Sequence, residues 1–239
     1  MTRLSMLLDA LFPLGHDVVV DANLVRGSAC TAVAERVEVV GTANAAAVDA
    51  KLALAMADRI LGAMEGAPRP LVFLVDTSGQ ALRRHEELIG LNAYLAHLAC
   101  TVDVARRGGF PSVSIVYGEA ISGGYLSLGL MADRAFALAD AQIRVMDLQA
   151  MARVTRLPHE QLQKLARESP VFAPGADNYA KMGALDAIWA NPSAELLCNA
   201  LADVMRASSR SDGRLAAGHE RGGRVLGEPT AAAVVRAMR

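Results

Sequence analysis

The hydrophobic pattern of the chain divides into short β-branched runs and longer segments with helical spacing. Residues 71–76 (LVFLVD) and 113–117 (VSIVY) are nearly continuous apolar runs, which are typical of strands buried on both faces of a sheet. Apolar residues recur every three or four positions in residues 45–64 and from about 81 to 107, which predicts an amphipathic helix before each strand. This alternation of strand and helix indicates an α/β fold.

The same pattern predicts which helical residues face the core. For the first helix we expect the buried positions Leu54, Ala57, Leu61 and Met64, and for the second Leu88, Leu91, Leu95, Leu98, Val102 and Ala105. Further strands are expected near residues 17–20, 36–40, 134–138, 142–146 and 184–189, and further helices near 148–156, after 158, near 178, over 193–206 and at the end of the chain. We expect one domain over residues 1–239. Residues 208–228 are rich in Gly, Arg and Ser, which predicts a flexible loop.

Each of the two apolar strands runs into a turn of small and polar residues, 76–80 (DTSGQ) and 118–124 (GEAISGG). We expect Ser122 to cap a helix that starts at the second turn. The amides of Gly123, Gly124 and Tyr125 then have no intrahelical acceptor, and the positive end of the helix dipole lies behind them. Glycines let the backbone approach an oxyanion closely, so the turn is a candidate anion site.

Common nucleotide and nucleophile motifs do not fit the second turn. Gly118 and Gly123 have the separation of a P-loop, but Gly124 stands where the phosphate-binding Lys is needed. The turns contain neither a GxGxxG fingerprint nor a GxSxG elbow, so the cap is favoured over a covalent nucleophile for Ser122. The histidines lack metal-like spacing, and we expect no metal site.

Four side chains near the turns have two readings each. His85 is either a solvated helix residue, which is favoured, or a proton carrier. Asp76 either caps its turn, which is favoured, or acts as an acid or base. Tyr117 and Tyr125 bracket the second turn and either line a pocket or pack in the core, and the core role is favoured for at least one of them.

Composition limits the partners and the compartment. The formal net charge of −1 gives no reason to expect nucleic acid or an anionic membrane as a partner. The longest uncharged stretch, residues 120–132, is too short to span a bilayer. Asp9 interrupts a signal-like apolar start, and three widely spaced cysteines suggest reduced thiols, so we expect a cytoplasmic protein.

Longer motifs resemble a known family. VDTSGQALRRHEE near Asp76 and VYGEAISGGY near Gly123 resemble the carboxyltransferase branch of the crotonase superfamily. The segments GQALRRHEELIGLNAYLAHLA, SIVYGEAISGGYLSLGLMADRAFAL, VMDLQAMARVTRL and SPVFAPGADNY resemble the gamma subunit of biotin-independent malonate decarboxylase, over about residues 71–189. The resemblance implies a crotonase-like ββα superhelix that forms one carboxyltransferase half, pairs with a homologous beta subunit and acts on a malonyl thioester.

The resemblance also implies where the site lies. Backbone amides of Ser78 and Gly79 would form one oxyanion hole, and those of Gly123 and Gly124 the other, in an enzyme that releases carbon dioxide. The candidates for substrate contact are Ser122, Tyr125, Tyr117 and Gln80. No cofactor is expected to bind directly, because the thioester is carried on the prosthetic group of an acyl carrier protein.

Two other functions remain open at this level. A stand-alone hydratase or isomerase acting on an acyl-CoA would need a carboxylate near the second turn, and Glu119 is the obvious one. A non-catalytic subunit that stabilises a sister chain would need only the fold. The arginines of residues 208–228 either are solvated or meet an acidic carrier protein or a phosphate.

Overall fold

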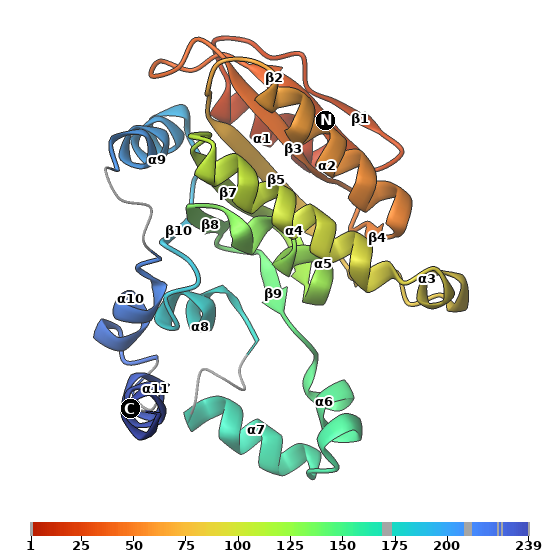
Figure 1. The fold of residues 1–239 in the computed structure, drawn as a ribbon, viewed down its shortest axis with the longest axis vertical. Coiled ribbons are helices and arrows are strands. Elements are labelled where there is room, and N and C mark those ends of the chain that lie inside the picture. The colour runs from red at the N-terminus through yellow and green to blue at the C-terminus, as the bar shows by residue number, and fades with distance from the viewer. Residues whose placement is uncertain (1, 169–173, 208–211, 224, 226, 239) are drawn as a thin grey trace.

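A mixed sheet of eight strands organises the computed structural model, which describes residues 2–168, 174–207, 212–223, 225 and 227–238 (Figure 1). The strand order is β1-β2-β3-β5-β7-β8-β10, and β9 pairs with the end of β7. The first two pairings are antiparallel and the others are parallel. The strands are β1 (Val19–Asp21), β2 (Leu24–Ala29), β3 (Val37–Thr42), β5 (Leu71–Thr77), β7 (Ser112–Ile121), β8 (Arg134–Leu138), β9 (Gln142–Arg144) and β10 (Ala187–Trp189).

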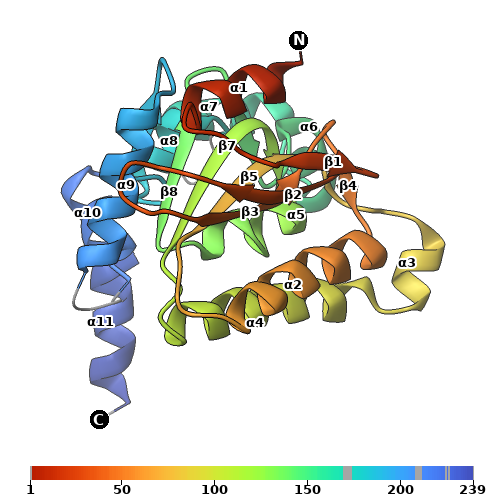
Figure 2. The same ribbon diagram turned by 90° about the horizontal axis from the view of Figure 1, so that it is seen from above.

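Helices cover both faces of β5, as its continuous apolar run predicts. Val72 and Leu74 pack with α1 (Arg3–Leu11) and α9 (Ala194–Arg206) on one face. Leu71 and Phe73 pack on the other face with α2 (Ala50–Met64) and α4 (Leu91–Arg107), which lie side by side (Figure 2). The buried central strand therefore holds its carboxyl end in a fixed place.

That carboxyl end is where the chain builds a second, two-stranded sheet. β4 (Ala47–Val48) pairs in parallel with β6 (Gly79–Gln80), which follows β5 after one residue. β7 lies beside β5 in the same direction, so both strands end at the same edge of the main sheet. The turns after the two strands are thereby brought to one place.

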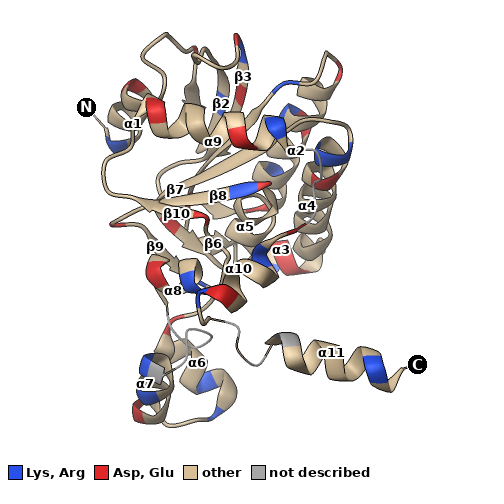
Figure 3. Ribbon diagram, turned by 90° about the vertical axis from the view of Figure 1, so that its left-hand side faces the viewer, with Lys and Arg blue, Asp and Glu red and all other residues tan. Residues whose placement is uncertain are grey.

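The remaining helices lie around the two ends of the sheet. They are α3 (Arg84–Leu88), α5 (Ser122–Leu126), η1 (Gly129–Met131), α6 (Leu148–Thr155), α7 (His159–Glu168), α8 (Ala176–Lys181), α10 (Arg214–Glu220) and α11 (Gly227–Ala237). The α6–α7 hairpin lies well below the sheet in Figure 1, and α11 extends away from the other elements in Figure 3. In the described ranges, no helix combines the length and the apolar run that crossing a bilayer requires.

The two long helices differ from their predicted form. The first helix begins only at Ala50, because the Asp49 side chain caps it by accepting a hydrogen bond from the amide of Leu52. Its buried face differs from the predicted one, and Leu54 is 38% exposed. The second is broken at Gly90, whose φ of 74° is left-handed, into α3 and α4. Leu88 lies before this break and is 75% exposed, so the prediction that it is buried was wrong.

The sequence pattern did not predict the helix at the start of the chain, whereas the helix predicted at the end is present as α11. In α1, residues Leu4, Leu7, Leu8 and Leu11 are buried in the core. The predicted loop over residues 208–228 is wrong for Arg214–Glu220, which forms α10. Residues 208–211, 224 and 226 of that prediction lie outside the described residues.

Candidate functional site

The two predicted turns lie against each other, as the parallel pairing of β5 and β7 requires. A Cβ atom placed on Gly124 would lie 2.7 Å from Thr77 Oγ1 and 2.9 Å from the carbonyl oxygen of Gly79. A Cβ atom on Gly79 would lie 3.3 Å from the carbonyl oxygen of Ile121. The absence of side chains at Gly79 and Gly124 therefore permits the close approach of the two backbones.

Most of the predicted oxyanion donors already have an acceptor within the chain. The amide of Gly123 donates to Gln80 Oε1 at 3.0 Å, and that of Gly79 to Thr77 Oγ1 at 3.1 Å. The amide of Ser78 donates to the carbonyl oxygens of Ala45 and Ala46, at 3.3 and 3.2 Å. The expectation that both turns present unoccupied amides is therefore wrong for these three residues.

Gly124 differs from the other three donors. It is buried in the first turn of α5, and its amide has no acceptor in the part of the chain that the structure describes. Gly123 is half-buried, and its amide is held by a side chain and not by the backbone. A change of the Gln80 side-chain rotamer is therefore sufficient to free the Gly123 amide for a ligand.

Ser122 is not the helix cap that its position suggests. It is the first residue of α5, Ile121 occupies the N-cap position, and no side chain caps the helix. The reason is that β9 pairs with Glu119–Ile121 and extends β7 by four residues beyond the predicted end at Tyr117. The chain turns at once from strand to helix, and Ser122 takes a strained left-handed φ of 48°.

Asp76 ties the two turns to a third segment. Its Oδ2 accepts a hydrogen bond from the amide of Ala45, and its Oδ1 from the amide of Glu119, both at 2.9 Å. A Cβ atom on Gly118 would lie 2.1 Å from Asp76 Oδ1, so only glycine leaves room for the carboxylate there. The prediction that Asp76 caps its own turn is therefore wrong: its carboxylate accepts amides from two other segments.

Thr77 and the loop at Asn44–Ala46 complete the site, and the sequence reading missed both. Thr77 is buried, donates to the carbonyl oxygen of Ala46 at 2.6 Å and accepts from Gly79. Asn44 and Ala45 have left-handed φ angles of 62° and 48°. The sequence signal for this turn was Asn44 among small residues, since Asn tolerates the left-handed conformation.

The other candidate acids and bases, Glu119 and His85, are ion-paired and solvent-exposed, respectively. Glu119 Oε1 lies 3.6 Å from Arg144 Nη2, and both side chains are partly exposed. His85 lies on α3 with an exposed side chain, in agreement with the favoured reading. The second turn therefore presents backbone groups next to an ion pair.

Both tyrosines belong to the core. Tyr117 is 2% exposed, its hydroxyl donates to the carbonyl oxygen of Thr42 at 2.9 Å, and burial raises the pKa of its hydroxyl. Tyr125 is 1% exposed and packs its ring against Gly129, and burial raises its pKa as well. The favoured core role is confirmed for both, and this placement gives no support to direct substrate contact.

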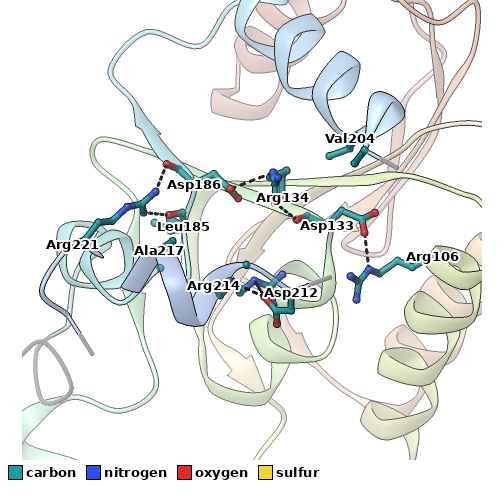
Figure 4. A pocket seen from close by; sticks show the side chains of 13 residues that line it. Arg106, Asp133, Arg134, Leu185, Asp186, Val204, Asp212, Arg214, Ala217 and Arg221 are labelled. Atoms are coloured by element: carbon teal, nitrogen blue, oxygen red, sulfur yellow. Dashed lines mark hydrogen bonds and ion pairs between the residues drawn. The ribbon is translucent and has the colours of Figure 1, made fainter. Parts of the chain in front are cut away.

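A charged cavity of about 210 Å³ lies at the opposite end of the parallel strands (Figure 4). It is lined by arginines and aspartates of α4, α10, the start of β8 and the segment before β10. Their pairs include Arg106 with Asp133 at 2.8 Å and Arg134 with Asp186 at 3.4 Å. Burial raises the pKa of Asp186, against the opposing effects of the Ala135 amide and neighbouring arginines.

Two arginines of the predicted flexible segment point inward at this cavity. Arg221 donates to the carbonyl oxygens of Ala180 and Leu185, both at 2.7 Å, and Arg214 donates to that of Ala132 at 2.5 Å. They attach α10 to the body of the protein. Their guanidinium groups are therefore engaged by this chain, and not held ready for an acidic partner.

Known proteins with the same architecture identify the fold. A chain of the Pseudomonas malonate decarboxylase MdcD–MdcE hetero-dimer is similar, with a TM-score of 0.74 and 27% identity. The likeness covers 96% of this chain and 100% of that chain. Transcarboxylase 12S is similar with a TM-score of 0.68 over 88% of this chain and 42% of that chain, and at 20% identity it shows the fold alone. The predicted crotonase-like α/β fold of a carboxyltransferase half is confirmed.

Sequence relatives identify the family within this fold. The malonyl-S-ACP:biotin-protein carboxyltransferase MADD of Malonomonas rubra is 32% identical over 170 residues, which cover 66% of this chain and 58% of that relative. This chain thus matches little more than half the length of the curated relative. The family described as malonate decarboxylase gamma subunit matches residues 43–238. Since that match covers most of the chain, the protein belongs to the malonate decarboxylase gamma subunit family.

Proposed function

We propose that this chain acts with a homologous beta subunit to release carbon dioxide from a malonyl thioester carried on an acyl carrier protein. Family membership, the likeness to the MdcD–MdcE hetero-dimer and the malonyl-S-ACP substrate in the name of the Malonomonas relative support the proposal. The three free cysteines fit a cytoplasmic location.

The observation that carries the proposal is the Gln80 oxygen on the Gly123 amide. This carboxamide oxygen, 3.0 Å from the nitrogen, is an sp² acceptor like the oxygens of a thioester or a carboxylate. The turn is therefore shaped to receive an oxygen of that kind. In the proposed reaction, Gln80 withdraws and an oxygen of the malonyl thioester takes its place at Gly123, next to the amide of Gly124.

The chemistry needs such donors. When the bond between the carboxylate carbon and the α-carbon breaks, carbon dioxide leaves and the bonding electrons move toward the thioester oxygen as an enolate. Amides aimed at the oxygen where negative charge grows lower the barrier, and each typically contributes about a hundred- to a thousandfold in rate. Protonation of the α-carbon then gives the acetyl thioester.

Division of the site between two subunits follows from the same proposal. Ser78 donates to backbone carbonyls and Gly79 to the buried Thr77 hydroxyl, whereas Gly123 donates only to the half-buried Gln80 side chain. The gamma subunit therefore offers Gly123 and Gly124 as its donors, and the beta subunit supplies the rest of the site. A stand-alone hydratase is less well supported because Glu119, its candidate carboxylate, is paired with Arg144.

Co-expression with an MdcD-type beta subunit tests the proposal. We expect the purified complex to convert malonyl-ACP to acetyl-ACP and carbon dioxide, and each subunit alone to be inactive. Full activity of this chain alone would overturn the shared site. A Gly123→Leu variant that forms the complex and keeps its activity would show that the turn is only structural.

A further inference from the structure

Asp76 joins three segments that are distant in the sequence. Each of its carboxylate oxygens accepts one backbone amide at 2.9 Å, from Ala45, which lies 31 residues earlier, and from Glu119, which lies 43 residues later. Its own amide donates to Thr42 Oγ1 at 3.1 Å. In the described part of the chain, the carboxylate forms no ion pair with Lys or Arg. Backbone amides are thus its main partners.

The first of these bonds supports the first turn. Ala45, which Asp76 holds, belongs to the left-handed loop whose carbonyl oxygens accept the amide of Ser78 and the hydroxyl of Thr77. Thr77 in turn accepts the amide of Gly79. A shift of the Ala45 amide is therefore passed on to the turn at Ser78–Gly79.

The second bond supports the second turn. The pairing of β5 with β7 is irregular at this point: Val75 pairs with Val116, but Thr77 pairs with Ala120, so β7 carries extra residues opposite Asp76. The Glu119 amide lies in this bulge, and the Asp76 side chain supplies the acceptor for it. Ser122 and Gly123 follow after two further residues of β7, so the bulge sets their direction.

We infer that Asp76 is a positioning residue: its carboxylate fixes the distance between the two turns, and with it the place of the Gly123 and Gly124 amides. The inference rests on the proposed function, since the amides matter only if they meet a substrate oxygen. It assigns Asp76 no proton transfer, because both of its oxygens are occupied by backbone donors.

Asp76→Asn tests this inference in the complex with the beta subunit. Asparagine has the same shape but only one acceptor oxygen, and its NH₂ group meets one of the two amides, donor against donor. We expect kcat for malonyl-ACP to fall on the order of a hundredfold, because a displacement near 1 Å at a reacting group costs about that much. KM should change by less than about threefold.

Asp133→Asn is the matched control. Asp133 also accepts a backbone amide, that of Ser112 at 2.8 Å, and it pairs with Arg106, but it lies just before β8, away from the turns. We expect a loss of thermal stability like that of Asp76→Asn and an unchanged kcat. If wild type and Asp133→Asn are active and Asp76→Asn is equally active, the inference fails. An inactive wild-type complex refutes the proposed function instead.

A second variant keeps the test decisive if Asp76→Asn does not fold. Asp76→Glu retains both oxygens one methylene further from the backbone, so both amides keep an acceptor in a displaced position. We expect a reduced kcat, KM within about threefold of wild type and a folded complex by circular dichroism. A kcat equal to that of wild type in this variant would also overturn the positioning role.

Discussion

The side-chain oxygen of Gln80 lies 3.0 Å from the backbone nitrogen of Gly123, and this hydrogen bond joins the two turns of the site. Gln80 sits on β6 and is paired through its backbone with Val48, so only its side chain has to move to release the amide. The Gln80 oxygen therefore occupies the Gly123 amide in this chain.

Changing Gln80 should alter substrate affinity more than the chemical step. Gln80→Ala removes the competing oxygen, so KM for malonyl-ACP should fall severalfold in the complex. Gln80→Glu places a carboxylate on the amide, and because charge-assisted hydrogen bonds are about twice as strong, KM should rise about tenfold. Gln142→Glu, the same change on exposed Gln142 of β9, should leave KM as in wild type. An identical KM in all three variants would contradict the competition.

Adding a methyl group at Gly124 should separate the turns. In Gly124→Ala the new carbon meets Thr77 Oγ1 at 2.7 Å and the backbone of Gly79 at 2.9 Å, so one of the turns must shift. We expect kcat to fall about a hundredfold while the complex still forms on size-exclusion chromatography. Gly62→Ala on α2 meets nothing within 4 Å and should be neutral or more stable by about 0.5–1 kcal/mol. Equal kcat values for the two variants would disprove the prediction.

The Glu119 carboxylate should be dispensable. Glu119→Gln loses a partly exposed ion pair with Arg144, which typically contributes less than about 1 kcal/mol. Steady-state assays of the complex should give a kcat within about twofold of wild type. A decrease in kcat of several hundredfold would contradict this prediction. It would favour the stand-alone hydratase function, in which this carboxylate performs the acid–base chemistry.

Stability should depend on the protonation of Asp186. Burial raises its pKa in the folded protein above the ordinary value of 3.8, so the folded state binds its proton more tightly than the unfolded state does. The resulting stabilisation is full below pH 3.8 and is lost as the pH rises through the raised pKa. Denaturant titrations should show that Asp186→Asn, which keeps an acceptor for the Ala135 amide, lacks this decline. Parallel pH profiles for the variant and the wild type would contradict it.

The sequence predicted the centre of the fold and the two strand-to-turn units because these depend on local patterns. The continuous apolar run of β5 predicts burial on both faces, and the same strand-to-turn pattern occurs twice in the sequence. The two successive glycines, Gly123 and Gly124, indicate that another group can approach the backbone closely. These inferences need no knowledge of distant partners.

The missed features depend on pairing between distant segments. Ser122 has the propensity of a cap, but β9 extends β7 to Ile121 and removes the position that a cap would need. Gln80 occupies the Gly123 amide from 43 residues away. The α1 helix is a different case: Leu4, Leu7, Leu8 and Leu11 have helical spacing, but a short apolar segment after Arg3 also resembles a leader.

The hydrogen bonds of Asp76 have a consequence for the order of folding. Its partners lie 31 and 43 residues away, so no isolated helix, hairpin or strand–turn unit holds the complete arrangement. Loops of that length must close before either bond forms, and such closures are slow compared with the formation of local helices. A nascent chain that has emerged only as far as α4 possesses Asp76 and Ala45 but not Glu119. The two turns therefore reach their final spacing only after β7 has joined the sheet.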